Sequence, residues 1–164
     1  MADVTRTAEV DPIPLTDLAE LGTASGRAVS IFLPTARAGA EVRENPIRAK
    51  SLIKDAETRL KAHGVAQEES DEILGPLVAL LEDDAYWQRL SDGLALFASK
   101  GFWRAYRLST DVAEAVHVSD RFAVRPIVPA AVGDGEFLVL AGSQNKVRLL
   151  EGTASTIREL DLGS

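Results

Sequence analysis

The chain of 164 residues contains no cysteine, and this absence removes several kinds of chemistry at once. Without a thiol there is no disulfide framework, no thiolate metal site and no cysteine nucleophile. A chain without disulfides suits the reducing cytosol, so we expect a cytoplasmic protein. Hydrophobic residues still make up 46% of the sequence, which is enough for an ordinary buried core.

Long apolar runs are also missing. The longest are of strand length, and the polar start of the chain leads into no apolar signal core. A membrane-spanning helix needs about 20 consecutive apolar residues, and a secretory signal needs an apolar core of its own. We therefore expect neither a secretory signal nor a membrane partner.

Residues suited to catalysis are few. There are two histidines, His63 at a predicted helix end and His117 in a predicted strand, and neither is near a nucleophile in the sequence. The sequence contains no phosphate-binding loop, dinucleotide glycine fingerprint, nucleophile elbow or His-Glu-x-x-His motif. Asp83 and Asp84 fit an acidic helix start better than a metal pair. The sequence thus predicts no catalytic residue, metal or cofactor.

The first half of the chain predicts helices around one strand. Residues 1–12 are polar and are predicted to form a flexible tail. A short helix begins at Leu15 and stops at Gly22, and residues 28–34 are typical of a buried strand that ends at a proline. Asn45 followed by Pro46 predicts a helix start with Asn45 as N-cap, and apolar residues at helical spacing continue to Gly64.

Within the second half of the chain, the spacing of the apolar residues changes from helical to alternating. A helical pattern over residues 73–81 is interrupted by Gly75 and Pro76, which predicts a kink or two shorter helices, and Asp83 and Asp84 can cap one more turn. Alternation then predicts strands at 94–98, 102–108, 113–118 and 122–128, and a three-stranded meander at 137–141, 146–151 and 156–160.

The fold class predicted from this order is α/β (α+β), with a mixed, mainly antiparallel sheet packed with helices. A boundary at 130–135 would separate an α/β domain of residues 13–132 from the meander at 136–164. Three strands without a covering layer are marginal on their own, so the meander either packs on the first domain or begins a longer, truncated second one.

The charges are unevenly distributed. The net charge of −7 argues against indiscriminate nucleic-acid binding, DNA included. Residues 27–61 nevertheless carry eight Lys and Arg against four Asp and Glu, whereas residues 66–92 carry one cation against eight anions. Pairing of one helix with the other explains this pattern most simply. The alternative is two faces for two partners, with Lys50, Lys54 and Lys61 on one helical stripe that can neutralise RNA phosphates.

Three aromatics, Phe102, Trp103 and Tyr106, could stack on bases, but strand alternation favours the core for Phe102 and Tyr106.

Four short segments in order carry a resemblance to a known family. They are Val-Ser-Ile-Phe-Leu-Pro at residues 29–34, Ser-Asp-Gly-Leu-Ala-Leu-Phe at 91–97, Asp-Arg-Phe at 120–122, and residues 137–153. With a basic helix between the first two, this order resembles the front end of archaeo-eukaryotic class-I peptide release factors, and more closely their bacterial relatives. The resemblance spans the chain from about Arg27 onward.

The family's decoding motifs are only partly present. Its Asn-Ile-Lys-Ser loop corresponds to residues 45–51, which keep the asparagine, a cation and Lys50-Ser51 but not the tetrapeptide. Its Tyr-x-Cys-x-x-x-Phe motif falls on Val116, Val118 and Phe122, where only the phenylalanine is kept. These departures argue against stop-codon recognition and leave ribosome binding as the expectation. The Gly-Gly-Gln tripeptide that promotes peptidyl-tRNA hydrolysis in the family does not occur in this sequence.

The resemblance implies a ribosome-associated protein, in rescue, hibernation or termination-type release, that binds rRNA through its basic loop and helix. The implied contacts are Arg37, Arg43, Asn45, Arg48, Lys50, Ser51 and Lys54. The alternative is a protein-interaction module that keeps the fold without a role in translation. In that case the acidic segment 68–84 would meet a basic protein partner.

Overall fold

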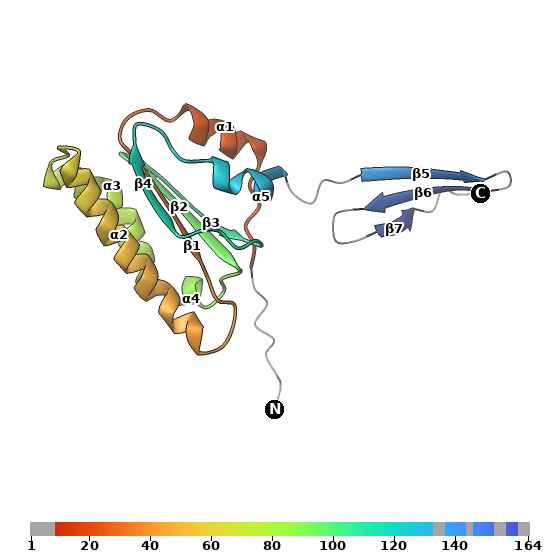
Figure 1. Cartoon of the computed structure of the whole chain (residues 1–164), viewed down its shortest axis with the longest axis horizontal. Coiled ribbons are helices and arrows are strands. Elements are labelled where there is room, and N and C mark those ends of the chain that lie inside the picture. The colour runs from red at the N-terminus through yellow and green to blue at the C-terminus, as the bar shows by residue number, and fades with distance from the viewer. Residues whose placement is uncertain (1–8, 133–136, 144–145, 153–156, 161–164) are drawn as a thin grey trace.

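The computed structural model describes residues 9–132, 137–143, 146–152 and 157–160. Their strands form two separate sheets, a four-stranded sheet in the order β3-β2-β1-β4 and a three-stranded sheet in the order β5-β6-β7 (Figure 1). Every strand pair is antiparallel. The α/β class, with helices packed on a mainly antiparallel sheet, is therefore confirmed.

The two central strands have helices on both faces. Strand β1 is Ala28–Pro34 and β2 is Gly93–Ser99, and in each the first six residues are buried. Such a strand has no polar side, which explains why its sequence alternates so weakly. β2 continues through a tight turn at Gly101, whose φ of 74° suits glycine, into β3, Phe102–Leu108. Strand β4, Ala115–Ser119, pairs with the other side of β1.

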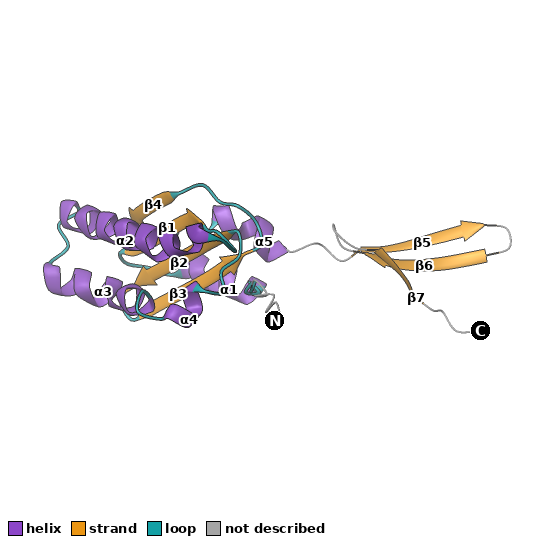
Figure 2. Cartoon of the chain, turned by 90° about the horizontal axis from the view of Figure 1, so that it is seen from below, coloured by secondary structure: helices purple, strands orange, loops and turns teal. Residues whose placement is uncertain are grey.

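Two long helices cover one face of the sheet. Helix α2 is Glu44–Ala62, entered from a short 3₁₀ turn at Ala40–Arg43, and α3 is Gln67–Leu80. They lie side by side along the strands (Figure 2). A short helix α4, Asp84–Trp87, is capped by Asp83 as the sequence predicts, since its carboxylate accepts from the Tyr86 N–H at 3.0 Å. Pro76 lies inside α3, so the prediction of two shorter helices is wrong.

Smaller elements cover the other face. They are α1, Leu15–Thr23, a 3₁₀ turn at Arg125–Ile127 and α5, Val128–Val132. The prediction of a strand over 122–128 is wrong, because Pro126 and Pro129 lack the N–H a strand needs and fit the first turn of a helix. Phe122, which precedes these turns, packs edge-on against Phe97 at a centroid distance of 5.5 Å.

The free edge of β3 is partly covered by the segment before α1. Asp11 donates its backbone N–H to the Arg107 carbonyl at 3.0 Å, and its carboxylate holds the Arg107 guanidinium at 2.7 and 3.0 Å. Glu9 pairs with the same guanidinium, which also lies 5.1 Å from the centre of the Tyr86 ring. The predicted flexible tail over residues 1–12 is therefore wrong for Glu9–Asp11, and residues 1–8 lie outside the described part of the chain.

The predicted meander is present as β5, Phe137–Ser143, β6, Lys146–Gly152, and β7, Ile157–Leu160. Its register pairs Phe137 with Gly152 and Gly152 with Ile157. Helix α5 ends at Val132, the predicted end of the first domain, and the boundary at 130–135 stays a prediction. Residues 133–136 and the two turns of the meander, at 144–145 and 153–156, lie outside the described residues.

Candidate nucleic-acid interface

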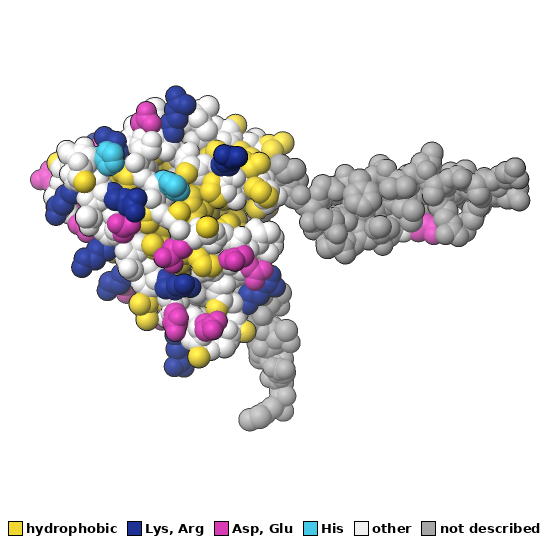
Figure 3. All heavy atoms as spheres, in the orientation of Figure 1, with side chains coloured by type: hydrophobic (Ala, Val, Ile, Leu, Met, Phe, Trp, Pro, Cys, Tyr) yellow, Lys and Arg dark blue, Asp and Glu magenta, His cyan; other side chains and the backbone are white. Residues whose placement is uncertain are grey.

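The predicted contacts lie on α2 and on the loop that leads into it. The cations that share one side of the helix are all exposed and form what we call the basic stripe: Arg43, Lys50, Lys54 and Lys61. Their spacing of seven, four and seven residues keeps them on one face. The predicted stripe of Lys50, Lys54 and Lys61 is thus confirmed as a solvent-facing surface. Dark-blue side chains follow α2 on the lower left of Figure 3.

The cations of the basic stripe are not held in ion pairs with other described residues. None of its four members takes part in an ion pair within the part of the chain that the structure describes. The simplest interpretation of the charge pattern, pairing of α2 with α3, is therefore wrong for these residues. Between the two helices, the neutral carboxamide of Gln67 instead donates a hydrogen bond from Nε2 to Glu57 Oε1 at 2.9 Å.

Arg48 lies on the opposite flank of α2. Two residues correspond to about 200° around a helix axis, so Arg48 and Lys50 point in different directions. The Arg48 guanidinium is 3.9 Å from the Glu114 carboxylate, a loose ion pair in which both side chains are about half exposed. On the same flank, Arg59 binds Asp55 and donates to the Val116 carbonyl of β4 at 3.0 Å. The structure therefore does not unite Arg48 with the basic stripe.

Arg37 is held at the loop. Its guanidinium forms a two-pronged ion pair with Asp92, the residue before β2, and its side chain is 50% exposed. This hydrogen bonding raises the pKa of Arg37 above its usual value. A phosphate would have to displace Asp92 or share the guanidinium with it, so Arg37 is a weaker candidate contact than the unpaired lysines.

Asn45 does not cap the helix. Helix α2 begins one residue earlier, at Glu44, and the N-cap position, Arg43, makes no side-chain cap. The Asn45 side chain is only 1% exposed, and its carboxamide binds Ala36 twice, accepting from the N–H at 3.1 Å and donating to the carbonyl at 3.0 Å. The prediction of an N-cap is wrong because the amide satisfies the backbone of a loop nine residues earlier. Sequence spacing gave no signal for this bond.

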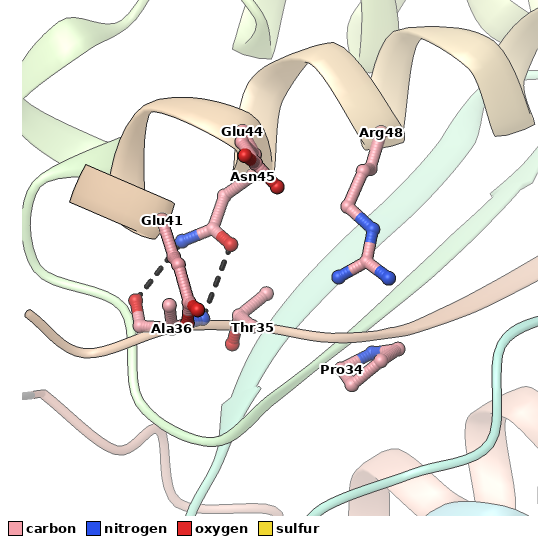
Figure 4. A pocket seen from close by; sticks show the side chains of 7 residues that line it. All are labelled: Pro34, Thr35, Ala36, Glu41, Glu44, Asn45 and Arg48. Atoms are coloured by element: carbon pink, nitrogen blue, oxygen red, sulfur yellow. Dashed lines mark hydrogen bonds between the residues drawn. The ribbon is translucent and has the colours of Figure 1, made fainter. Parts of the chain in front are cut away.

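A pocket of about 370 Å³ opens between this loop and the first turn of α2 (Figure 4). Arg48 points toward Pro34 at one side of it. Glu41 and Glu44 also line the pocket, and both are exposed. Two carboxylates against one guanidinium disfavour a phosphate, so the stripe rather than the pocket is the candidate nucleic-acid interface.

The remaining predicted positions are divided between surface and core. Ser51 is exposed on the outer ridge of α2. Val116 and Phe122, at the family's decoding-motif positions, are each 6% exposed and pack in the core on opposite faces of the sheet. As the alternation predicts, Phe102 and Tyr106 pack with one core cluster, whereas Trp103 on the other face is 40% exposed.

The described residues also bear on two other classes of site. No group of three or more His, Asp or Glu side chains there is placed to hold a metal ion. No helix in that part of the chain is both long and apolar enough to cross a bilayer.

The comparisons with known proteins support the fold. No family model matches the chain, and no curated protein matches it either. Among solved structures it is similar to an "Archaeal protein", with a TM-score of 0.51 over 93% of this chain at 12% identity. The chain spans 45% of the length of that protein. A likeness at this identity shows a shared fold, so the class defined here is an α/β protein, with a helix face whose cations form no ion pairs among the described residues.

Proposed function

We propose that this protein is a ribosome-associated, release-factor-like translation factor that binds ribosomal RNA through the basic stripe of α2. The observation that carries the proposal is the lack of ion pairs at Arg43, Lys50, Lys54 and Lys61 among the described residues of a chain with net charge −7. In an acidic protein, a row of cations without carboxylate partners is suited to an anionic partner outside the chain.

RNA fits this surface better than a small anion does. The stripe runs along most of α2, about 27 Å from residue 43 to residue 61 at 1.5 Å per residue. A polyanion such as an RNA strand can contact all four cations, and each contact releases counterions. The resemblance of the sequence to release factors names the ribosome as the source of that RNA, with rescue, hibernation or termination-type release as the roles it implies.

Sedimentation tests the proposal. Full-length protein in lysates of growing and starved cells is separated on sucrose gradients, and we expect co-migration with 30S or 70S particles that is lost at high salt. Lys50→Gln/Lys54→Gln should move the protein to the top of the gradient. Arg89→Gln/Lys100→Gln is the matched control, because it removes two cations that already pair with Glu9 and Glu72. Protein that stays at the top under both growth conditions would refute the proposal.

A second candidate function is supported by the same separation of charge. Glu68 and Glu69 of α3 and Glu82 after it are exposed and form no ion pair with another described residue, which leaves them for a basic protein. Under this alternative, Glu68→Gln/Glu69→Gln would abolish a protein complex and leave ribosome association unchanged.

A further inference from the structure

A second group of basic side chains lies at β4, away from the basic stripe. We call Arg27, His117, Arg121 and Arg125 the β4 cluster. His117, Arg121 and Arg125 are exposed and Arg27 is half-buried. None of the four forms an ion pair with another described residue. In the upper part of Figure 3, separate dark-blue and cyan side chains lie among white and yellow atoms, with a magenta side chain beside the uppermost dark-blue one.

Strand register brings the cluster together around Ser30. His117 is the β4 partner of Ser30, and the Ser30 hydroxyl accepts the Ala123 N–H at 2.9 Å. That bond fixes the loop after β4 against the sheet, with Arg121 and Arg125 each two residues from Ala123. Arg27 precedes Ala28, whose β4 partner is Ser119. His117 and Ser30 therefore share one face of the sheet, and Arg27 lies at the end of the sheet where β4 ends.

No carboxylate of the described residues forms an ion pair with the β4 cluster. Residues 115–130 contain a single acidic residue, Asp120, which accepts from Ser119 at 3.1 Å. Two carboxylates of α1 already have partners: Asp17 accepts from the Tyr106 hydroxyl at 2.7 Å, and Glu20 pairs with Arg104 at 3.2 Å. The excess positive charge of the β4 cluster is thus left for a ligand.

The side-chain chemistry selects the ligand. The His117 ring forms a T-shaped pair with the ring of Phe32, at a centroid distance of 6.1 Å, and His117 is exposed to solvent. Imidazole and guanidinium planes stack on unpaired bases, while guanidinium groups also bind phosphates. A base-paired duplex keeps its bases inside and offers no face for stacking.

We infer that the β4 cluster binds a single-stranded segment of RNA, with Arg27, Arg121 and Arg125 on phosphates and His117 stacked on a base. This rests on the proposed function and extends it, because it adds a second RNA contact on another face and states that this part of the RNA is unpaired. The basic stripe offers lysine ammonium groups. An ammonium group does not stack on a base, and it binds the phosphates of single-stranded and of duplex RNA alike.

The test uses the full chain with fluorescently labelled RNA of about 12 nucleotides, single-stranded or as a blunt duplex. Affinity is measured by anisotropy over a range of KCl concentrations. For Arg121→Gln/Arg125→Gln we expect about tenfold weaker binding of the single strand and a salt slope smaller by about 1.4, since each lost phosphate contact removes about 0.7. His117→Ala should weaken single-strand binding about fivefold or more without changing the slope, as loss of stacking does. Duplex binding should change little in both variants.

Controls separate this inference from the proposed function. Circular dichroism and thermal melting verify that each variant folds, and His117→Ala, at an exposed strand position, provides a test that does not touch the loop. Arg89→Gln/Lys100→Gln should keep wild-type affinity. If the single strand binds, and Lys50→Gln/Lys54→Gln weakens it while both β4-cluster variants match this control, the inference is overturned and the proposed function stands. If the wild type binds neither RNA nor ribosomes, both are overturned.

Discussion

Asn45 and Ala36 form a reciprocal pair of hydrogen bonds that joins the first turn of α2 to the loop after β1. The carboxamide accepts from the Ala36 N–H and donates to the Ala36 carbonyl. Asn45 is only 1% exposed. Its carboxamide takes the place of water as the hydrogen-bond partner of the Ala36 backbone. Asn45, which the sequence analysis names as an RNA contact, is thus a structural anchor in this chain.

Replacing Asn45 should destabilise the protein. Asn45→Ala leaves the Ala36 N–H and carbonyl without partners, and each unsatisfied buried group costs about 1–3 kcal/mol. Asn45→Asp should be at least as damaging, because it buries a charge and turns the donor toward the Ala36 carbonyl into an acceptor. Urea denaturation measures both. Ser51→Ala, at an exposed position of the same helix, should remain within about 0.5 kcal/mol of wild type. An unchanged midpoint for Asn45→Ala would show that the anchor contributes nothing.

Gly93 opens β2 at a point where another backbone segment passes close by. A Cβ there would lie 2.5 Å from the Thr110 carbonyl oxygen and 3.1 Å from Val112 Cγ2. Gly93→Ala should therefore cost about 1–3 kcal/mol through overpacking. Close packing against Thr110 and Val112 therefore accounts for a glycine at position 93.

At Gly22, the same change from glycine to alanine should have the opposite effect on stability. It lies inside α1, and a Cβ there meets nothing within 4 Å. Gly22→Ala should stabilise the protein by about 0.5–1 kcal/mol, since alanine is the better helix former. Thermal melting of the two variants side by side should show shifts of opposite sign, and shifts of equal sign would contradict the geometry at Gly93.

The contact of Asp11 with Arg107 predicts a pH dependence. Burial alone would raise the pKa of Asp11, but the hydrogen bonds and charge of Arg107 outweigh it and lower that pKa from 3.8. A carboxylate with a lowered folded-state pKa stabilises the fold above its unfolded pKa and loses this contribution as the pH falls through the folded value. The stabilisation is therefore complete above about pH 4 and declines in more acidic solution.

Asp11→Asn isolates this contribution. We expect the variant to lose about 1–2 kcal/mol of unfolding free energy at pH 7, and its difference from wild type to shrink at pH 3, where the wild-type carboxyl also becomes protonated. Asp111→Asn, at an exposed position, should follow wild type at both pH values. A difference that is the same at both pH values would show that the carboxylate charge is not what binds Arg107.

Periodicity in the sequence was sufficient to predict the main elements. The weak alternation of residues 28–34, the hairpin around Gly101 and the apolar spacing of α2 reflect local preferences, and the structure has β1, β2, β3 and α2 at those places. The predictions failed where a distant contact decides. Asn45 binds a loop instead of its own helix end, and Glu9 and Asp11 are ordered by an arginine on β3.

The predictions for the candidate site also succeeded where local spacing decides and failed where a distant contact decides. Helical spacing sufficed to place Lys50 and Lys54 on one exposed stripe. It could not reveal that Arg37 is paired with Asp92 or that Arg48 faces Glu114, because these partners are 55 and 66 residues further along the chain. Nor could it reveal the β4 cluster, because the pairing of β1 with β4 places Arg27 at the end of a strand about 90 residues further along the chain.

The two flanks of α2 should respond differently to RNA. Lys50→Gln and Lys54→Gln each remove an unpaired cation from the basic stripe, so each should lower the salt slope of log affinity by about 0.7 with a single strand and about 0.9 with a duplex. Arg48→Gln removes the same charge from the other flank, where the guanidinium lies 3.9 Å from Glu114. Its slope should stay near that of wild type, because no phosphate contact is lost. Anisotropy titrations over a range of KCl concentrations measure all three slopes. A loss of slope at Arg48→Gln equal to that at Lys50→Gln would place the RNA across the loop and the pocket instead of along the basic stripe.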